Sequence, residues 1–455
     1  MKKHIFTLAV ACILLSSCGI YSKYKPSDTV PENLYGENVM PEDSAGPRTM
    51  DWRDLFTDPF LQTLIERGLQ NNTDYLSAGL RVKEAEATLL SAKLAYLPSL
   101  YLSPQVTISS FDGAKATKAY SVPVTACWEI DIFGKLRNAK RQSQALYAQS
   151  RDYKQAVRTQ VIAGIANTYY TLLMLDAQLE ISEETRLSWK ETASATRALM
   201  NAGMADEAAV SQMEAAYYSV CASVLDLKEQ INQVENSMSL LLAETPHAVE
   251  RGRLEAQNIP TGFSTGIPVQ LLSNRPDVRA AERSLEQAFY ATNQARSAFY
   301  PSITLSGSAG WTNSAGNMIV NPGKFLASAV GSLTQPLFAR GQLAGQLKIA
   351  KAQQEEARLI FQQTLLQAGS EVNDALTQYQ TARDKSELYE KQVASLQTAY
   401  RSTSLLMQHG NTTYLEVLTA LQSLLSARLT QVANHTTEVQ GIISLYQALG
   451  GGCDE

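Results

Sequence analysis

Carboxylate pairs and histidines are the side chains of this chain that could support catalysis. Glu183-Glu184 and Glu355-Glu356 stand in long helical patterns, where charge normally faces water, and neither pair has a nucleophile–base pattern or a phosphate-binding loop nearby. His247, His409 and His435 belong to no HExxH or HxxxH motif and have no cysteine partners. The sequence therefore predicts no enzyme active site, no metal centre and no cofactor.

A cysteine near the start is the residue whose setting does predict covalent chemistry. Two lysines precede the short apolar stretch IFTLAVACILL, which ends in Leu15-Ser16-Ser17-Cys18. This arrangement resembles a bacterial lipoprotein signal, in which residues 1–17 are removed and the Cys18 thiol is acylated. The alternative is an ordinary signal peptide with an incidental cysteine. Gly19 favours sorting to the outer membrane, and one acyl anchor holds a chain on a membrane without crossing it.

Charge and cysteine usage exclude several classes of protein. Removing residues 1–17 takes away two of the 39 basic residues and none of the 44 acidic ones, so the net charge falls from −5 to about −7. An acidic chain is a poor nucleic-acid binder. Cys127, Cys221 and Cys453 are too widely spaced to indicate a disulfide framework. No later run approaches ~18 consecutive apolar residues, so strands must make any crossing of a membrane.

Two similar stretches, identical at five of nine positions, reveal an internal repeat. AYLPSLYLS at 95–103 matches AFYPSITLS at 298–306, and LMNAG at 199–203 matches LMQHG at 406–410. The offset is about 205 residues and the order of elements is preserved, which indicates one supersecondary unit used twice.

Each half contains a pair of strands that alternate between apolar and polar residues. A period of two gives one apolar and one polar face, and a length of about ten to thirteen residues suits a tilted strand that crosses a bilayer. A soluble β-sandwich is the alternative, although its strands are usually shorter. The strands are expected at 99–110, 119–131, 301–311 and, most weakly, 325–338, with turns at 111–118 and 312–324.

Four strands cannot close a barrel, and open strand edges are not tolerated in hydrocarbon. Barrels begin at about eight strands, so two, three or four chains must contribute to one. The repeat therefore predicts an oligomer.

Unusually long helices are the other half of the pattern. From Lys135 to about Met200 there is no proline and one glycine, and small or apolar residues recur every three or four positions. The second half repeats this from about 342 to 407. Returning helices are expected at 206–243 and 412–448, and helices that lead into the strands at 55–94 and 276–297.

Several motifs resemble one family. WRDLFTDP at 52–59, WEIDIFGKLR at 128–137, LLSNRPDVRAAERSL at 271–285, YLEVLTALQSLLSAR at 414–428 and SLYQALGGG at 444–452 are similar to segments of TolC/OprM-type outer-membrane efflux lipoproteins, the outer-membrane factors of tripartite RND efflux systems. The resemblance covers essentially the whole mature chain. It implies a mixed α and β membrane protein: a homotrimer with a 12-stranded outer-membrane β-barrel, four strands per chain, continued by a long periplasmic α-helical barrel. It also implies a periplasmic membrane-fusion adaptor and an inner-membrane RND-type transporter as partners.

The resemblance also assigns roles to single residues. The helical tips near 201–206 and 408–413 would contact the adaptor, through Gly203, Met204, Gly410 and Asn411. Glu416 lies where the family narrows its periplasmic aperture with acids, although Thr419 stands where a second acid is common; a solvated tip carboxylate is the alternative. Asp206 and Glu207 are weaker candidates. Arg275, Pro276 and Asp277 form a structural motif, in which proline and aspartate suit a helix N-terminus and Arg275 pairs with a nearby acid.

The predicted function is passive conduction of small toxic compounds from the periplasm and pump to the exterior. The alternatives are a type I protein-secretion duct and a lipid-anchored coiled-coil stalk. The sequence does not identify the exported compound. The expected organisation is a signal peptide (1–17), a lipid-anchored extended segment (18–50), repeat 1 (51–245, with the β-hairpin 99–131), an equatorial linker (246–275) and repeat 2 (276–455, with the β-hairpin 301–338).

Overall fold

The computed structural model describes residues 22–25, 51–110, 112–257, 275–315, 318–409 and 412–451. The chain divides into two compact units. The first comprises the described parts of 1–29, 80–152 and 279–363, and the second those of 30–79, 153–278 and 364–455. The first unit contains all the strands, and the second contains the main apolar core.

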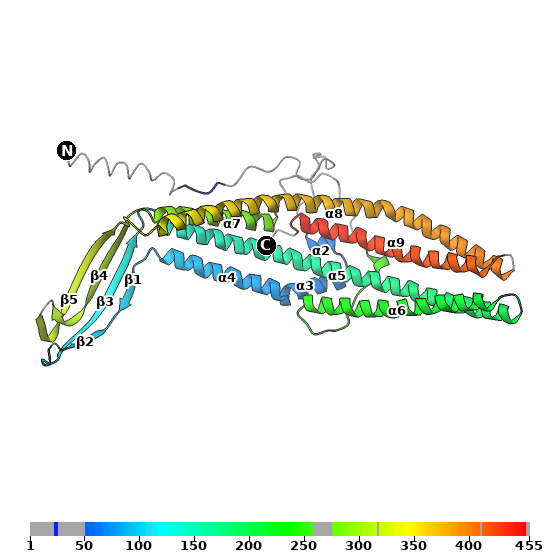
Figure 1. The fold of residues 1–455 in the computed structure, drawn as a ribbon, viewed down its shortest axis with the longest axis horizontal. Helices are drawn as coiled ribbons and strands as arrows, with labels where there is room; N and C mark the ends of the chain where they lie inside the picture. Colours follow the sequence, from blue (N-terminus) through cyan, green and yellow to red (C-terminus); the bar gives the residue numbers. More distant parts are fainter. Residues whose placement is uncertain are drawn as a thin grey trace. The chain divides into compact units, whose positions relative to one another are not determined.

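One antiparallel sheet is built from both halves of the chain (Figure 1). Its strands follow the order β1-β3-β4-β5, and β2 also pairs with β3. The connection from β3 to β4 contains the whole of the first helical hairpin, and the two predicted β-hairpins pair with each other along β3 and β4. The strands are β1 Ser99–Leu102, β2 Gln105–Ser109, β3 Thr117–Ile130, β4 Ser302–Ala315 and β5 Met318–Thr334.

The first predicted strand is wrong as a single element, so five strands replace the expected four. It breaks between Leu102, which pairs with Val124, and Gln105, which pairs with Ser121. Pro104 lies in the gap, and the register sets Pro123 of β3 opposite Ser103, whose amide still donates to the Pro123 carbonyl at 3.1 Å. Because proline has no backbone N–H, Pro123 cannot return the second hydrogen bond of this pair, so the ladder is interrupted there. β1 and β2 still occupy one strand position beside β3, so the sheet has four strand positions.

The predicted turn at 312–324 is also wrong over most of its length. β4 continues to Ala315 and β5 already begins at Met318, with an irregularity in register between Thr312 and Ser314. The Asn-Pro-Gly sequence at 321–323 indicates a turn but lies within β5. A proline is tolerated there because β5 is an edge strand of the sheet. β5 ends at Thr334, before the predicted 338.

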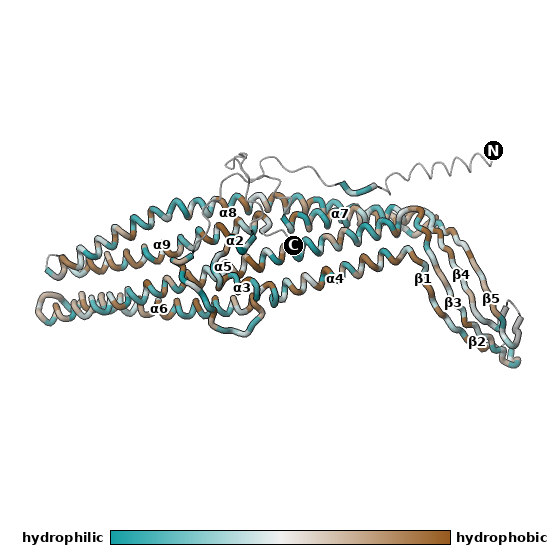
Figure 2. The backbone as a smooth tube through the Cα atoms, turned by 180° about the vertical axis from the view of Figure 1, so that it is seen from behind, coloured by the Kyte–Doolittle hydropathy of each residue, from teal (hydrophilic) through white to brown (hydrophobic). Residues whose placement is uncertain are grey.

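The long helices are confirmed, and the two halves match in length. α5 (Lys135–Asn201) and α8 (Gln342–Gln408) each have 67 residues. The returning helices α6 (Glu207–Leu241) and α9 (Tyr414–Ala448) each have 35. Apolar and polar residues are interleaved along all four, as Figure 2 shows, and none of the helices in the described parts is long and apolar enough to span a membrane.

The helix predicted at 55–94 is instead three helices, α2 (Trp52–Leu55), α3 (Pro59–Asn71) and α4 (Thr73–Leu94). Asp58 caps α3 by accepting from the amide of Phe60, and Pro59 takes the first helical position, where its missing N–H costs nothing. Asn72 separates α3 from α4, and its side chain accepts from two amides of the new helix at 3.0 Å each. The capping residues, not the apolar period, decide these boundaries.

The core of the second unit anchors the N-terminal helices to the long ones. Trp52, Leu55 and Ile65 are almost completely buried against Ile165 and Tyr169 of α5. The segment that follows α6, which includes the 3₁₀ helix η2 (Leu254–Ala256), is held by ion pairs and hydrogen bonds. Arg251 contacts Asp176 at 2.5 Å and Glu235 at 2.6 Å, and the Tyr169 hydroxyl donates to Asp58 at 2.6 Å.

Candidate functional site

The two faces of the sheet differ sharply in chemistry. Paired residues of neighbouring strands share a face, and the register aligns Thr125 with Ser308 and Ser328, and Val124 with Ala309 and Ala327. The apolar face of the sheet is thereby formed by Leu100, Leu102, Val106, Ile108, Tyr120, Val122, Val124, Trp128, Ile303, Leu305, Trp311, Phe325 and Leu333. Among the paired residues the charged side chains are Lys118, Glu129 and Lys324.

Exposure on these faces is the reverse of that in a water-soluble sheet. Along β3 the residues of the polar face, except Thr117, are half-buried, whereas most of those of the apolar face are exposed. Val106 is 74% exposed and Leu333 68% exposed. A continuous apolar surface of this kind marks contact with a membrane or another chain.

Aromatic side chains lie near both ends of the apolar face. Trp311 and Phe325 meet edge-to-face with ring centroids 5.4 Å apart. Near the opposite end the indole N–H of Trp128 donates to the carbonyl of Tyr96 at 2.8 Å. Aromatic belts at both interfaces are typical of membrane-spanning strands.

The first helical tip lies between α5 and α6. Gly203 has φ +74°, and the amide of Met204 donates to the carbonyl of Leu199 at 2.9 Å, which is the usual glycine-dependent end of a helix. Met204 is 71% exposed. Asp206 caps α6 by accepting from the amide of Ala209 at 2.8 Å, so its carboxylate has a structural use. Gly410 and Asn411 of the second tip lie outside the described residues.

Glu416 lies exposed in the first turn of α9. Its carboxylate accepts a hydrogen bond from the Thr412 hydroxyl, one turn earlier. The hydroxyl of Thr419 donates to the carbonyl of Leu415 at 2.8 Å, within its own helix. Glu416 is therefore the acid at the start of this helix that is open to solvent.

The acid pair of α5 does more than face water, a point that sequence reasoning missed. Glu183 pairs with Lys228 of α6 at 2.9 Å, and Glu184 with Arg428 of α9 at 2.7 Å. Each partner is on another helix, 45 residues away for Glu183 and 244 for Glu184, so no local signal reveals them. Nearby, the completely buried Trp189 packs against Met213 of α6 and Leu421 of α9. These contacts join the two hairpins within the second unit.

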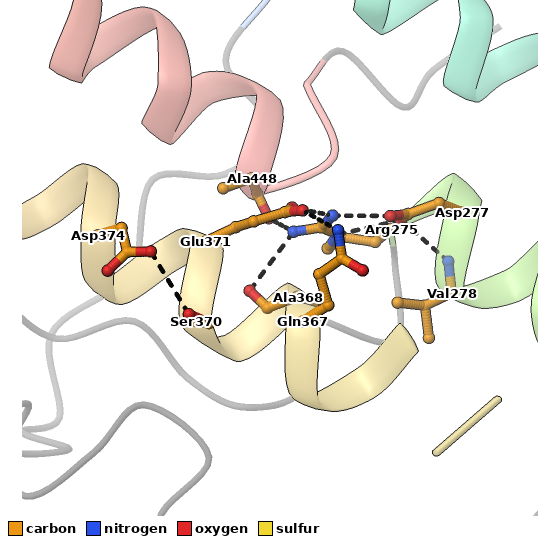
Figure 3. Close-up of polar contacts among 9 residues, drawn as sticks. All are labelled: Arg275, Asp277, Val278, Gln367, Ala368, Ser370, Glu371, Asp374 and Ala448. Atoms are coloured by element: carbon orange, nitrogen blue, oxygen red, sulfur yellow. Dashed lines mark hydrogen bonds and ion pairs between the residues drawn. The ribbon is translucent and has the colours of Figure 1, made fainter. Parts of the chain in front are cut away.

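Arg275 is the most connected side chain of the predicted motif (Figure 3). It is 5% exposed and lies directly before α7 (Pro276–Ser297). Its guanidinium donates to both carboxylate oxygens of Asp277, at 3.0 and 2.7 Å, and to Glu371 of α8 at 2.6 Å. It also donates to the carbonyl of Ala448, the last residue of α9, at 3.0 Å. The predicted acid partner is thus confirmed twice.

The end of α9 fits tightly around this arginine. A side chain at Gly450 (φ +89°) would place its Cβ 3.2 Å from the Cα of Arg275, and the Thr159 hydroxyl of α5 donates to the carbonyl of Gly451 at 3.1 Å. The motif therefore joins α5, α7, α8 and α9 within the second unit. Sequence reasoning named Arg275 but missed Glu371, which lies 96 residues away.

Known proteins confirm the family. The family model described as "Outer membrane efflux protein" matches residues 64–244 and 267–451. Similar proteins are the cation efflux system protein CusC of Escherichia coli (28% identical, 98% of each chain covered), the toluene efflux pump outer membrane protein TtgC of Pseudomonas putida (26%, 99% and 96%) and the probable outer membrane lipoprotein SilC of Salmonella typhimurium (26%, 99% of each).

Solved structures agree with the described fold. A crystal structure of CusC superposes with a TM-score of 0.83 at 27% identity, covering 95% of this chain and 99% of the other. The outer-membrane channel OprN gives a TM-score of 0.85 at 25% identity, again with 95% and 99% covered. The chain belongs to the outer membrane efflux protein family and is an outer-membrane efflux channel.

Proposed function

We propose that three copies of the chain close their sheets into one 12-stranded β-barrel across the outer membrane. The supporting observation is the sheet itself, whose exposed face is apolar and whose two outer positions, β1/β2 and β5, have no further partner among the described residues. Open edges are not tolerated in hydrocarbon, and four strand positions are fewer than barrels need. The number three follows the family resemblance.

Two neighbouring residues of β2 test this barrel. Val106 belongs to the apolar face and Thr107 to the polar face. A lysine on the lipid face costs about 2–4 kcal/mol in each chain near the bilayer midplane, whereas a lumenal lysine changes only the charge of the pore. We expect Val106→Lys to prevent assembly of heat-resistant oligomers, and Thr107→Lys to assemble and conduct cations less well in planar bilayers. The reverse pattern, or purified protein that forms no pores, would refute the proposal.

The helices would form the periplasmic part of the duct. Two structural repeats are supported by the matched lengths of α5 and α8 and of α6 and α9. We place the repeats at 51–245 and 276–455, with 246–275 as an equatorial linker. In this arrangement the tips at Gly203–Met204 and Gly410–Asn411 dock a periplasmic membrane-fusion adaptor, which connects the channel to an inner-membrane RND-type transporter. Copurification with the adaptor, lost on Met204→Asp, tests the first tip.

Glu416 is proposed to narrow the periplasmic aperture. Three exposed carboxylates, one from each chain, would repel one another and attract cations where the duct is tightest. We expect Glu416→Ala to raise single-channel conductance and to lower the preference for cations. Asp206→Asn is the matched control, because Asp206 is engaged in capping α6. Equal conductance in all three proteins would make Glu416 a solvated tip residue.

The covalent anchor is proposed at Cys18, which lies outside the described residues. Relatives include a protein named as an outer membrane lipoprotein, SilC. Labelled fatty acid should be incorporated into the wild-type chain and not into Cys18→Ala. Continued labelling of the variant would remove this assignment.

The exported cargo is proposed to be small toxic compounds, without a choice among them. Relatives of similar identity are named for cations (CusC, 28%) and for toluene (TtgC, 26%), so identity at this level does not select a substrate. A type I protein-secretion duct would share the architecture, but the family and these relatives are named for efflux. The sheet counts against a coiled-coil stalk. Deletion of the gene should lower resistance to some compounds and leave protein export unchanged.

A further inference from the structure

A short segment near the N-terminus is docked on the first unit. The carbonyl of Ser22 accepts from the Arg141 guanidinium of α5 at 3.4 Å. The amide of Tyr24 donates to the Tyr290 hydroxyl of α7 at 3.4 Å. The ring of Tyr24 meets the edge of the Phe289 ring with centroids 5.8 Å apart. Four residues of irregular chain are thus held by two helices that lie far away in the sequence.

The segment has an inner and an outer side. Ser22 and Tyr24 are half-buried, whereas Lys23 and Lys25 are exposed. The hydroxyl oxygen of Tyr24 is buried and has no hydrogen-bond partner among the described residues. Burial, together with the nearby carboxylates of Glu282 and Glu286, raises the pKa of this phenol to about 12. Tyr24 therefore holds the segment in place through its ring and its backbone amide, and its hydroxyl adds no hydrogen bond.

The receiving surface is held together without the segment. The Arg141 guanidinium lies over the Tyr290 ring, 5.6 Å from its centroid. Phe289 and Tyr290 meet edge-to-face at 5.4 Å. Arginine and both rings are therefore fixed by contacts among α5 and α7, so little order must be gained when Tyr24 docks.

The docking site lies close to the base of the sheet. Arg141 follows the first residue of α5, Lys135, by six positions, or about 9 Å of helix. Lys135 itself pairs with Glu129 at the end of β3 at 2.9 Å. Cys18 precedes Ser22 by four residues, which can span at most about 14 Å. From a docked Ser22, a lipid on Cys18 is therefore within reach of the sheet base, where Trp128 lies on the apolar face.

We propose that Ser22–Lys25 is a docking segment that seats the lipid carried by Cys18 beside the base of the sheet, with its receptor formed by Arg141, Phe289 and Tyr290. The placement of the lipid rests on the proposed acylation of Cys18, whereas the docking of the segment does not require the lipid. Without docking, the segment between Cys18 and the first helix would connect the lipid to the folded chain without fixing where the lipid lies. A docked segment places the acyl chains where the membrane-spanning strands begin.

Trypsin tests the docking, since it cleaves after Lys23, which is exposed but belongs to a held segment; the bond after Lys25 resists trypsin because Pro26 follows it. The full-length lipidated protein in nanodiscs is digested briefly, and release of the N-terminal peptide is followed by mass spectrometry. We expect Tyr24→Ala to accelerate this cleavage about tenfold, the factor that corresponds to a loss of about 1.4 kcal/mol of docking free energy. Tyr24→Phe is the matched control and should cleave like the wild type, and Arg141→Gln should resemble Tyr24→Ala.

Equal cleavage rates in Tyr24→Ala, Tyr24→Phe and the wild type would overturn the docking segment. A second protein, residues 19–455 exported behind a signal peptide without a lipobox, separates the two proposals. Protection in this unlipidated chain equal to that of the wild type supports docking, whereas protection only in the lipidated chain overturns it. Absence of fatty-acid label on the wild type would refute acylation and leave the protection measurements unaffected.

Discussion

Replacing Arg275 by methionine is the change for which the structure predicts the largest local effect. Methionine keeps much of the length of the side chain and removes every donor. The carbonyl of Ala448 then loses its hydrogen bond, and the carboxylates of Asp277 and Glu371 lose theirs. The perturbation therefore acts on the end of α9, the start of α7 and the middle of α8 at once.

The burial of the three side chains sets how much stability the Arg275→Met change removes. Breaking a fully buried ion pair costs about 3–5 kcal/mol. The side chain of Arg275 is 6% exposed, but those of Asp277 and Glu371 are 44% and 42% exposed, so both acids regain water when the arginine is lost. One hydrogen bond between a charged donor and the Ala448 carbonyl is worth about 1.5–3 kcal/mol. We expect a loss of about 2–3 kcal/mol of local stability.

Hydrogen exchange measures this loss where it occurs. The amides of Leu449, Gly450 and Gly451 close the end of α9 on carbonyls of its last turn, at 3.0 Å each. A loss of about 2–3 kcal/mol corresponds to exchange that is roughly 30- to 150-fold faster at these amides in the solubilised protein. The exchange rate of Arg275→Lys should lie between those of the wild type and Arg275→Met, because an ammonium makes point contacts and cannot bridge both acids and the carbonyl.

An exposed arginine provides the control. Arg253 pairs with Glu180 at 3.1 Å, with the two side chains 74% and 69% exposed, and such surface pairs contribute about 0–1 kcal/mol. Arg253→Met should leave exchange at the end of α9 unchanged. Unchanged exchange in Arg275→Met as well would show that Thr159 and the apolar core hold this helix end, and the argument from the arginine would fail.

Three further predictions concern single positions. Gly310→Ala should abolish assembly of heat-resistant oligomers, because the new Cβ would lie 2.2 Å from the backbone oxygen of Val122. Gly307→Ala is the control and should assemble, because its Cβ would lie 3.4 Å from the nearest carbonyl oxygen. Equal yields of oligomer from the two variants would contradict this prediction. Asp206→Ala should cost about 1 kcal/mol and speed exchange in the first turn of α6 about fivefold, whereas Asp206→Ser should retain the cap. Burial alone would raise the pKa of Asp277, but the hydrogen bonds and charge of Arg275 outweigh it and lower that pKa below the ordinary 3.8. The stabilisation that ionised Asp277 contributes is therefore present above about pH 4 and lost as the pH falls through the lowered pKa. The denaturation midpoints of the wild type and Asp277→Asn should accordingly differ above about pH 4 and converge only in acid below the lowered pKa.

Elements set by local chemistry were predictable from the sequence. Pro276 begins α7 as expected, because a proline loses nothing at a first helical position. The bounds of α5 and α8 lie within about one residue of prediction, since no proline interrupts them and small and apolar residues recur at the helical period. In the sheet, the predicted alternation of apolar and polar residues is confirmed by the register of the paired strands.

Apart from the helix predicted at 55–94, which the local caps Asp58 and Asn72 divide, the failures depend on a partner distant in the sequence. The first strand breaks at Ser103–Pro104, where Pro123 of β3 cannot donate to Ser103, and Pro322 is tolerated in β5 because that strand is at an edge. Glu371 was not recognised as a ligand of Arg275, nor Arg428 as the partner of Glu184. Register and helix packing decide these contacts, and neither is written in a local pattern.

The hydroxyl-rich face of the sheet would line the proposed barrel, and its hydrogen bonds bear on whether that barrel could select among solutes. Many of its hydroxyls are already satisfied within the sheet: Ser99 donates to the carbonyl of Cys127 at 3.1 Å, and Ser308 and Ser328 bond each other at 2.8 Å. Ser109 and Thr117 do the same at 3.0 Å. Such hydroxyls make the face polar but leave few unpaired donors or acceptors for hydrogen bonds to a solute. Tight binding would in any case slow the exit of the solute. We infer that the lumen is built to conduct and that discrimination among compounds is exercised by the partners that load it.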